Sequence, residues 1–211
     1  GRLLGRTVLN GIAVEDSEDI AIGPGPDPQM DYLYLADIGD NQQERPSVGV
    51  YRFPEPAVDL SQDDIRVFVD DIETISLTYP DGMRDAETGL VDPLTRDLYV
   101  ITKREPRSRI YLAAWPQSTT QTTPLEFVGA LRSGFATGGD VAPDGTEVLI
   151  RSYTNAYWFE RDPLSPLWQS LTVLACNVPL ADEPQGEAIG FDADGRDYFT
   201  ISEGEDQPIH R

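Results

Sequence analysis

Four acidic residues stand at corresponding places in four similar segments of the sequence. These are Glu18, Glu87, Asp140 and Glu187, and each opens a short apolar run that leads into a turn and a strand-like segment. Carboxylate oxygens are the ligands that hard cations prefer, and no histidine or cysteine accompanies them in the pattern. The spacing therefore predicts an oxygen-only cation site for calcium, ahead of magnesium and manganese. The alternative is that these carboxylates accept hydrogen bonds from backbone amides of neighbouring units.

The segments that carry these acids predict β-strands. Each apolar run leads to a turn, such as PDG at 143–145 or DG at 194–195, and then to a strand rich in aromatic and branched residues. Third strands follow, and fourth strands are predicted at 71–79, 123–131 and 169–177, while the acids recur 69, 53 and 47 positions apart. Four antiparallel strands repeated at about 40 to 50 residues are typical of a β-propeller. We therefore expect an all-β propeller of four-stranded antiparallel blades, as a single domain over residues 1–211.

The two ends of the chain leave the number of blades open. Residues 1–11 predict a strand without partners in its own unit, and residues 185–211 predict only three strands. Pairing the N-terminal strand with the last unit would close a four-bladed ring and protect both edges. In the alternative, the last blade stays incomplete and residues before Gly1 supply the inner strands of a fifth blade.

In a propeller the first strand of each blade lies next to the axis, so the four acids are expected to converge there. Two ionised carboxylates about 6 Å apart repel each other by roughly 3 kcal/mol at an effective dielectric constant of about 20. A ring of four therefore has to bind a cation, hold protons at raised pKa values, or pair with arginine.

A second group of polar residues follows the second strand of each unit and is expected to share one rim of the propeller. Mixed charge on loops held by a rigid scaffold suits a small polar ligand. The candidate ligand-binding residues are Asp37, Asp40, Asn41, Lys103, Arg151, Tyr153 and Glu203.

The composition excludes several classes of partner and chemistry. The net charge is −21, from 37 acidic and 16 basic residues, so we expect no binding to nucleic acid and no insertion into membranes. The same acidity suits either adaptation to high salt or ordinary solubility. His210 is the only histidine and Cys176 the only cysteine, which excludes Ser-His-Asp, Cys-His and His-zinc sites. Cys176 is expected in a buried strand.

The motifs SEDIAIGPG, LYLADIGDN, YPDGMRDAETGLVDP, TGGDVAPDG and PQGEAIGFDADG together span most of the chain. They resemble a family of bacterial secreted β-propellers that is distantly similar to esterase-like phytases and gluconolactonase-type propellers. The resemblance implies a propeller with calcium near the axis, a polar site on one face, and an extracellular or periplasmic location. This sequence departs from the family in having Ser17 where an aromatic residue is common, and in showing only residues 1–11 of a first blade.

Three functions are consistent with these features. We favour a binding or scaffold module, because histidine and nucleophile motifs are absent. The second is a calcium-dependent hydrolase of a lactone, ester or phosphoester, with Asp37 or Glu203 as base and Lys103 or Arg151 orienting the substrate. The third is a subunit of a larger assembly in which another chain completes the ring.

Overall fold

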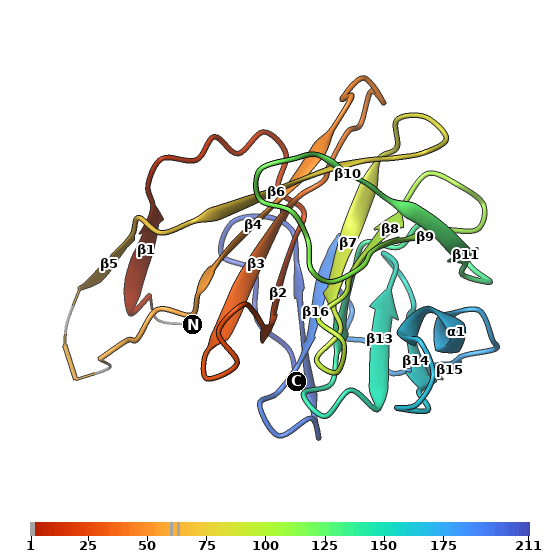
Figure 1. The fold of residues 1–211 in the computed structure, drawn as a ribbon. Coiled ribbons are helices and arrows are strands. Elements are labelled where there is room, and N and C mark those ends of the chain that lie inside the picture. The colour runs from red at the N-terminus through yellow and green to blue at the C-terminus, as the bar shows by residue number, and fades with distance from the viewer. Residues whose placement is uncertain (1–2, 60, 63) are drawn as a thin grey trace.

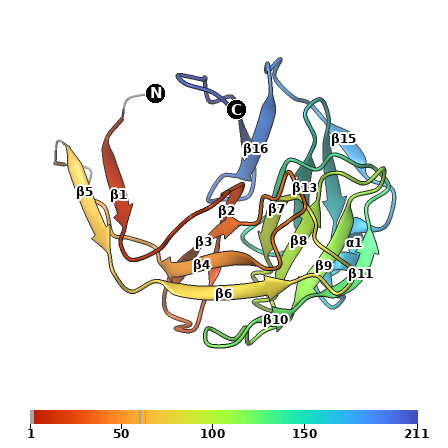
Figure 2. The same cartoon turned by 90° about the horizontal axis from the view of Figure 1, so that it is seen from above.

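The computed structural model describes residues 3–59, 61–62 and 64–211, which form sheets arranged side by side around an axis (Figures 1 and 2). Three sheets have four or five strands, and their first strands lie next to the axis. These innermost strands contact one another in chain order, β2 to β7, β7 to β12 and β12 to β16. This is the predicted β-propeller, and its blades have the following strands.

From the axis outward, the first blade contains β2 (Asp19–Pro24), β3 (Asp31–Asp37), β4 (Val48–Pro54), β6 (Glu73–Thr78) and β10 (Thr123–Pro124). The second contains β7 (Ala86–Val91), β8 (Leu98–Thr102), β9 (Arg109–Ala113) and β11 (Glu126–Ala130). The third contains β12 (Gly138–Val141), β13 (Glu147–Arg151), β14 (Ala156–Glu160) and β15 (Cys176–Val178). The fourth sheet has β16 (Gly186–Phe191) and β17 (Tyr198–Ser202). Within these blades the strands pair antiparallel, except that β10 joins β6 in parallel.

The N-terminal strand does not close the ring. β1 (Gly5–Leu9) pairs in parallel with β5 (Ile65–Val69), and these two strands lie across an opening from β16 (Figure 2). The predicted third strand of the last unit is reduced to one bridge between Thr200 and His210. Closure of the last blade by the N-terminal strand was therefore wrong, and the last sheet has two strands among the described residues.

Each hydrophobic core lies between two neighbouring blades. Tyr34 and Ile75 of the first blade pack with Val100 of the second, in a cluster of fully buried residues. A second core joins the second and third blades and includes Leu167 of the short helix α1 (Leu167–Leu171). A smaller third core around Ile189 joins the third and fourth blades. Because each blade presents one face to the next, the packing fixes the height of every inner strand along the axis.

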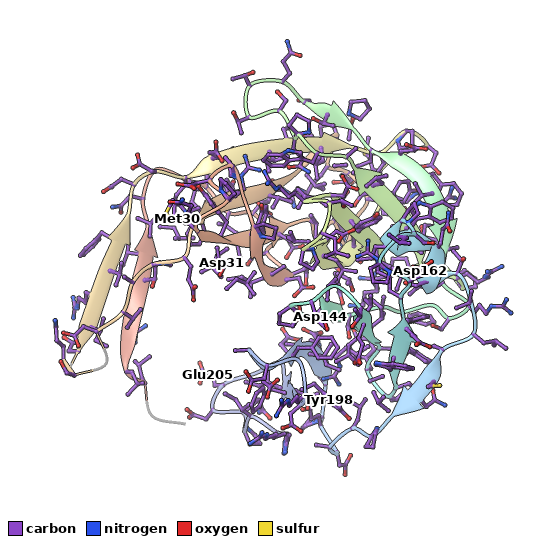
Figure 3. The ribbon with its side chains drawn as sticks, turned by 60° about the horizontal axis from the view of Figure 1, so that its bottom comes forward. Met30, Asp31, Asp144, Asp162, Tyr198 and Glu205 are labelled. Carbon is purple, nitrogen blue, oxygen red and sulfur yellow. The ribbon has the colours of Figure 1, made fainter. Side chains whose placement is uncertain are left out.

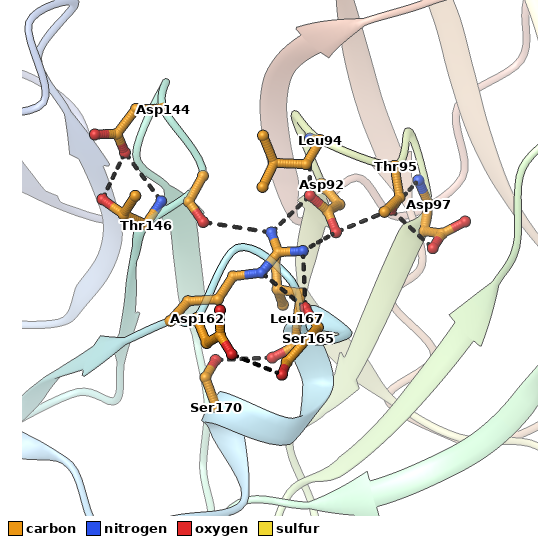
Figure 4. A network of polar contacts seen from close by, with 12 residues as sticks. Asp92, Leu94, Thr95, Asp97, Asp144, Thr146, Asp162, Ser165, Leu167 and Ser170 are labelled. Carbon is orange, nitrogen blue, oxygen red and sulfur yellow. Dashed lines mark hydrogen bonds and ion pairs between the residues drawn. The ribbon is translucent and has the colours of Figure 1, made fainter.

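A buried ion pair also joins the second and third blades. Asp92, in the turn after β7, accepts hydrogen bonds from Arg161 Nη1 at 2.7 Å and from Nη2 at 2.8 Å (Figure 4). The same carboxylate accepts the Leu94 amide and the Thr95 hydroxyl, so it organises its own turn as well. Removing only one partner of a pair this deeply buried is costly, because the remaining charge has neither a counter-ion nor water around it.

The local predictions were tested at two further places. The predicted turns are present, because Gly145 and Gly195 adopt positive φ values of +73° and +65°, a region that glycine enters at the lowest steric cost. The prediction for Cys176 was wrong, because this residue is exposed. It lies on β15, the outermost strand of its blade, which pairs only with β14. Within the described ranges, no helix has the length and hydrophobicity needed to cross a membrane.

Candidate functional site

The starts of the inner strands bring three of the four predicted acids to one end of the propeller. Glu87 and Glu187 occupy the same position in their blades, because the pairing register skips one residue at each, between Ala86 and Thr88 and between Gly186 and Ala188. Such β-bulges redirect a side chain away from the regular alternation. Glu18 directly precedes β2, where its amide donates to the Ala36 carbonyl at 3.0 Å. We call Glu18, Glu87, Glu187 and Lys103 the acidic mouth.

Lys103 supplies the positive charge within the acidic mouth. It follows β8, and its Nζ donates to Glu87 Oε1 and lies 4.9 Å from the centroid of the Tyr153 ring. Both side chains of the pair are almost fully buried. The second oxygen of this carboxylate, Glu87 Oε2, is buried and has no hydrogen-bond partner among the described residues. The mouth therefore contains an acceptor that the described chain leaves unsatisfied.

Burial and crowding shift the acidity of the mouth. Burial raises the pKa of Glu18 to about 8, and the charge of Glu87 adds to the effect while Lys103 opposes it. Burial likewise raises the pKa of Glu87 to about 7, although Lys103 lowers it and Glu187 raises it. Burial disfavours the charged form of Lys103, but its hydrogen bonds to Glu87 and Tyr153 and the charges of these two groups together outweigh burial, so the pKa of Lys103 is raised. Raised pKa values of Glu18 and Glu87 are one of the three solutions expected for such a ring, and a lysine pair takes the place expected for arginine.

Gly39 shows how closely these groups pack. A Cβ at this position would lie 2.4 Å from Glu18 Oε1 and 2.5 Å from the carboxyl carbon of Asp16. The sequence motif DIGDN therefore needs its glycine for space, so that two carboxylates fit against the backbone.

Asp140 does not belong to this group. Its strand β12 has no bulge, so it lies in regular register opposite Leu149, and its oxygens accept the amides of Val141 and Phe191 at 2.8 Å each. Burial raises its pKa to about 6, while these two amides lower it. Asp19 makes the same kind of link, from its carboxylate to the Gly89 amide at 3.0 Å. For Asp140, the hydrogen-bonding alternative describes the structure, with adjacent blades joined through a carboxylate.

The described side chains do not fit a metal ion as they stand. No group of three or more histidine, cysteine, aspartate or glutamate side chains in residues 3–59, 61–62 and 64–211 has an arrangement that could hold one. Lys103 also pairs with one oxygen of Glu87, which leaves only the second oxygen of this carboxylate for another ligand. Calcium binding stays a prediction from the sequence.

The acidic residues of the DIGDN loop serve mainly to hold loops. Asp37 accepts two backbone amides of the segment before β2, at 2.8 and 3.1 Å, and pairs with Arg45 at 3.1 Å. Asp40 accepts the amides of Glu44 and Arg45 at 2.8 and 2.9 Å. The amide oxygen of Asn41 accepts a hydrogen bond from Arg104. These three candidates therefore lie on the predicted rim, but much of their acceptor capacity is used internally.

The remaining rim candidates differ in their exposure. Arg151 is 1% exposed and joins two blades, because Nη1 donates to Glu183 at 2.8 Å and to the Ala188 carbonyl at 3.0 Å. Glu203 is exposed, and Gln185 donates both to it and to Glu187, the latter at 3.0 Å. Arg151 is thus an internal support, whereas Glu203 borders the mouth.

Asp85 is the residue of this region that sequence reasoning missed. It is 1% exposed, accepts the Asp40 amide at 2.9 Å and pairs with Arg104 Nε at 2.5 Å. The signal was present, since Asp85 stands two residues before Glu87 in the repeated segment. Its role depends on the neighbouring blade, which no local pattern specifies.

Comparisons with known proteins add little to this geometry. No family model matches the chain, and no curated protein matches it. Among solved structures, Kuenenia stuttgartiensis hydrazine synthase is similar at 12% identity and a TM-score of 0.48, over 95% of this chain and 47% of that chain. A structure described as the Dos1 propeller is similar at 10% identity and a TM-score of 0.42, over 88% of this chain and 42% of that one. This chain therefore spans less than half the length of each of these structures.

Proposed function

We propose that this propeller is a binding module that holds a small, positively charged polar ligand in the acidic mouth. The observation that carries the proposal is Glu87 Oε2, a buried acceptor without a partner among the described residues. An unpaired buried acceptor is costly, so a ligand that donates to it is favoured. The mouth holds the three carboxyl groups of Glu18, Glu87 and Glu187 against the single ammonium of Lys103, so a cationic donor that displaces the proton of Glu18 is favoured.

Proton release distinguishes this ligand class from a neutral one. With a pKa of about 8, Glu18 holds a proton in roughly nine-tenths of molecules at pH 7. A bound cation lowers that pKa, so binding should release up to about one proton per site. Calorimetric titration with 1,4-diaminobutane at pH 7, in two buffers of different ionisation enthalpy, measures this number directly.

Two variants make the titration specific. Glu18→Gln should still bind but should release fewer protons than the wild type, because only Glu87, with a pKa of about 7, still holds a proton in part of the molecules. Glu160→Gln removes an exposed carboxylate of β14 and should behave as wild type. A parallel titration with calcium chloride tests the calcium prediction in the same mouth. Absence of saturable heat with the diamine, or undiminished proton release in Glu18→Gln, would contradict the proposed function.

A calcium-dependent hydrolase is the second candidate, and one observation favours its acid–base chemistry, although not its metal. Two carboxyls with pKa values of about 8 and 7 lie together, which is the range in which a general acid or base works at neutral pH. Turnover of a lactone, an ester and a phosphoester, with and without calcium, tests this reading. Activity that is present in the wild type and lost in Glu87→Gln would replace the binding module as the conclusion.

The place of action is also part of the proposal. The secreted propellers that the motifs resemble suggest an extracellular or periplasmic location. Fractionation of cells that express the native gene would decide it, and recovery in the cytoplasmic fraction would rule that location out.

A further inference from the structure

A cavity lies at the end of the inner strands opposite the acidic mouth. It has a volume of about 480 Å³ and is lined by the ends of β2, β12 and β16 and by Pro93, which follows β7. All four blades therefore contribute to it. Figure 3 brings this face forward and shows on it Asp31, at the start of β3 in the first blade, and Asp144, in the turn after β12 in the third blade.

The lining combines apolar side chains with carboxylates. Ile22, Val141 and Phe191 form apolar wall, together with three prolines, while Asp31, Asp140 and Asp192 also line the cavity. No lysine or arginine is among the lining residues. Ile22 is 48% exposed in spite of its position on an innermost strand, so apolar surface is left open to the cavity.

We propose that this cavity binds a small hydrophobic cation, in which an aromatic or branched body carries an ammonium group. The body packs on Ile22, Val141 and the Phe191 ring, whose face also attracts a cation. The ammonium lies toward the carboxylates of Asp140 and Asp31. This site is separate from the acidic mouth and does not depend on the function proposed for it.

The state of Asp140 supports the charge of the ligand. Both of its oxygens are fixed by backbone amides, so the carboxylate does not need to reorganise when a cation arrives. Its pKa of about 6, raised by burial and lowered by the amides, leaves it mostly ionised at neutral pH. The amide of Arg196 donates to Asp192 and lowers its pKa, and the positive charge of Arg211 lowers this pKa further by a smaller amount. The cavity is therefore negative under ordinary conditions, and a charge partly removed from water attracts a cation strongly.

Three probes of similar size separate the contributions. Benzylammonium, benzyl alcohol and benzoate share one ring and differ in charge. At pH 7.5 and low salt, calorimetric titration should show benzylammonium binding about tenfold or more tighter than benzyl alcohol, and no measurable binding of benzoate. In nuclear magnetic resonance spectra, the largest amide shifts should lie at Gly23, Val141 and Phe191.

The chain offers a closely matched pair of variants. Ile22→Lys places a positive charge in the cavity, whereas Ile20→Lys adds the same charge two residues earlier on the same face of β2, at a residue that does not line the cavity. Both side chains are exposed, at 48% and 56%, so both variants should fold. Ile22→Lys should lose at least tenfold in benzylammonium affinity, and Ile20→Lys less than about threefold.

Three outcomes would overturn the proposal. They are equal affinity for benzylammonium and benzyl alcohol, equal losses in the two lysine variants, and absence of saturable binding of benzylammonium at millimolar concentration. Binding that is kept in Ile22→Lys, and whose proton release is diminished in Glu18→Gln, would assign the amine to the acidic mouth. That result would overturn the second site while leaving the proposed function intact.

Discussion

Replacing Glu18 by glutamine isolates the electrostatic cost of the acidic mouth. Glutamine keeps the size of the side chain, which matters because Glu18 packs against Gly39. It also mimics the protonated carboxyl, which is the form that burial favours. The variant should therefore be as stable as the wild type in acid and more stable in alkali.

The size of the effect follows from linkage. The pKa of Glu18 is raised from 4.5 to about 8, so ionising this carboxyl in the folded state costs at most roughly 5 kcal/mol relative to the unfolded chain. Solvent around a half-buried group screens this value, and we expect about 2 to 3 kcal/mol. Because the pKa of Glu18 is higher in the folded chain than in the unfolded chain, the wild type loses about 2 to 3 kcal/mol of folding free energy as pH rises from 4.5 through 8. The gain of Glu18→Gln is thus near zero at pH 4.5 and complete near pH 9.

Urea unfolding and thermal melts at pH 4.5, 7 and 9 measure this gain. For a chain of this length, 2 to 3 kcal/mol corresponds to a rise in Tm of about 5 to 10 °C at pH 9. Glu160→Gln controls for the change in net charge and should shift the Tm by less than about 2 °C. A stability difference that stays constant from pH 4.5 to 9, or a variant less stable than wild type at pH 9, would refute the reasoning.

Three further substitutions test individual contacts. Lys103→Met leaves the buried carboxylate of Glu87 unpaired and should lower the free energy of unfolding by about 2 to 4 kcal/mol at pH 8.5. The loss should be smaller at pH 5, where the Glu87 carboxyl is protonated. Urea unfolding at both pH values checks this, and equal losses would contradict it. Arg161→Met removes the partner of the buried carboxylate in Figure 4 and should cost about 3 to 5 kcal/mol by urea unfolding; a loss below about 1 kcal/mol would show that the pair is not buried as described. Gly186→Ala places a methyl group 1.6 Å from Arg151 Nη2 and should lower the Tm by several degrees. In the control Gly190→Ala the new methyl group has its nearest neighbour at an ordinary 3.5 Å, so the Tm should not change. Similar Tm values for the two variants would contradict the close approach at Gly186.

The strands and the turns were predictable because their signals are local. The segment YLYLADI became β3, which spans Asp31–Asp37, and EVLIR became β13, which spans Glu147–Arg151. Branched and aromatic residues favour the extended backbone, and Gly145 permits the positive φ that its own turn requires. The convergence of Glu18 and Glu87 also followed from the repeat, because equivalent residues of successive blades face one axis.

The site was decided by register and by neighbours. A one-residue bulge directs the side chains of Glu87 and Glu187 toward the acidic mouth. The strand β12 has no such bulge, and Asp140 instead accepts a hydrogen bond from the Phe191 amide of the next blade. The pairing of β1 with β5 likewise joins strands that are distant in sequence, whereas Lys103 reaches Glu87 within the hairpin of β7 and β8.

The sequence by itself determined which segments extend, where they turn, and that acidic residues recur at the start of inner strands. Only the tertiary structure decided which of those acids meet, which hold a proton, and which strand lies at an open edge. The physical reason is that strand and turn preferences arise from a residue and its immediate neighbours. Register, burial and the charge around a carboxyl arise from atoms that the fold brings from other blades.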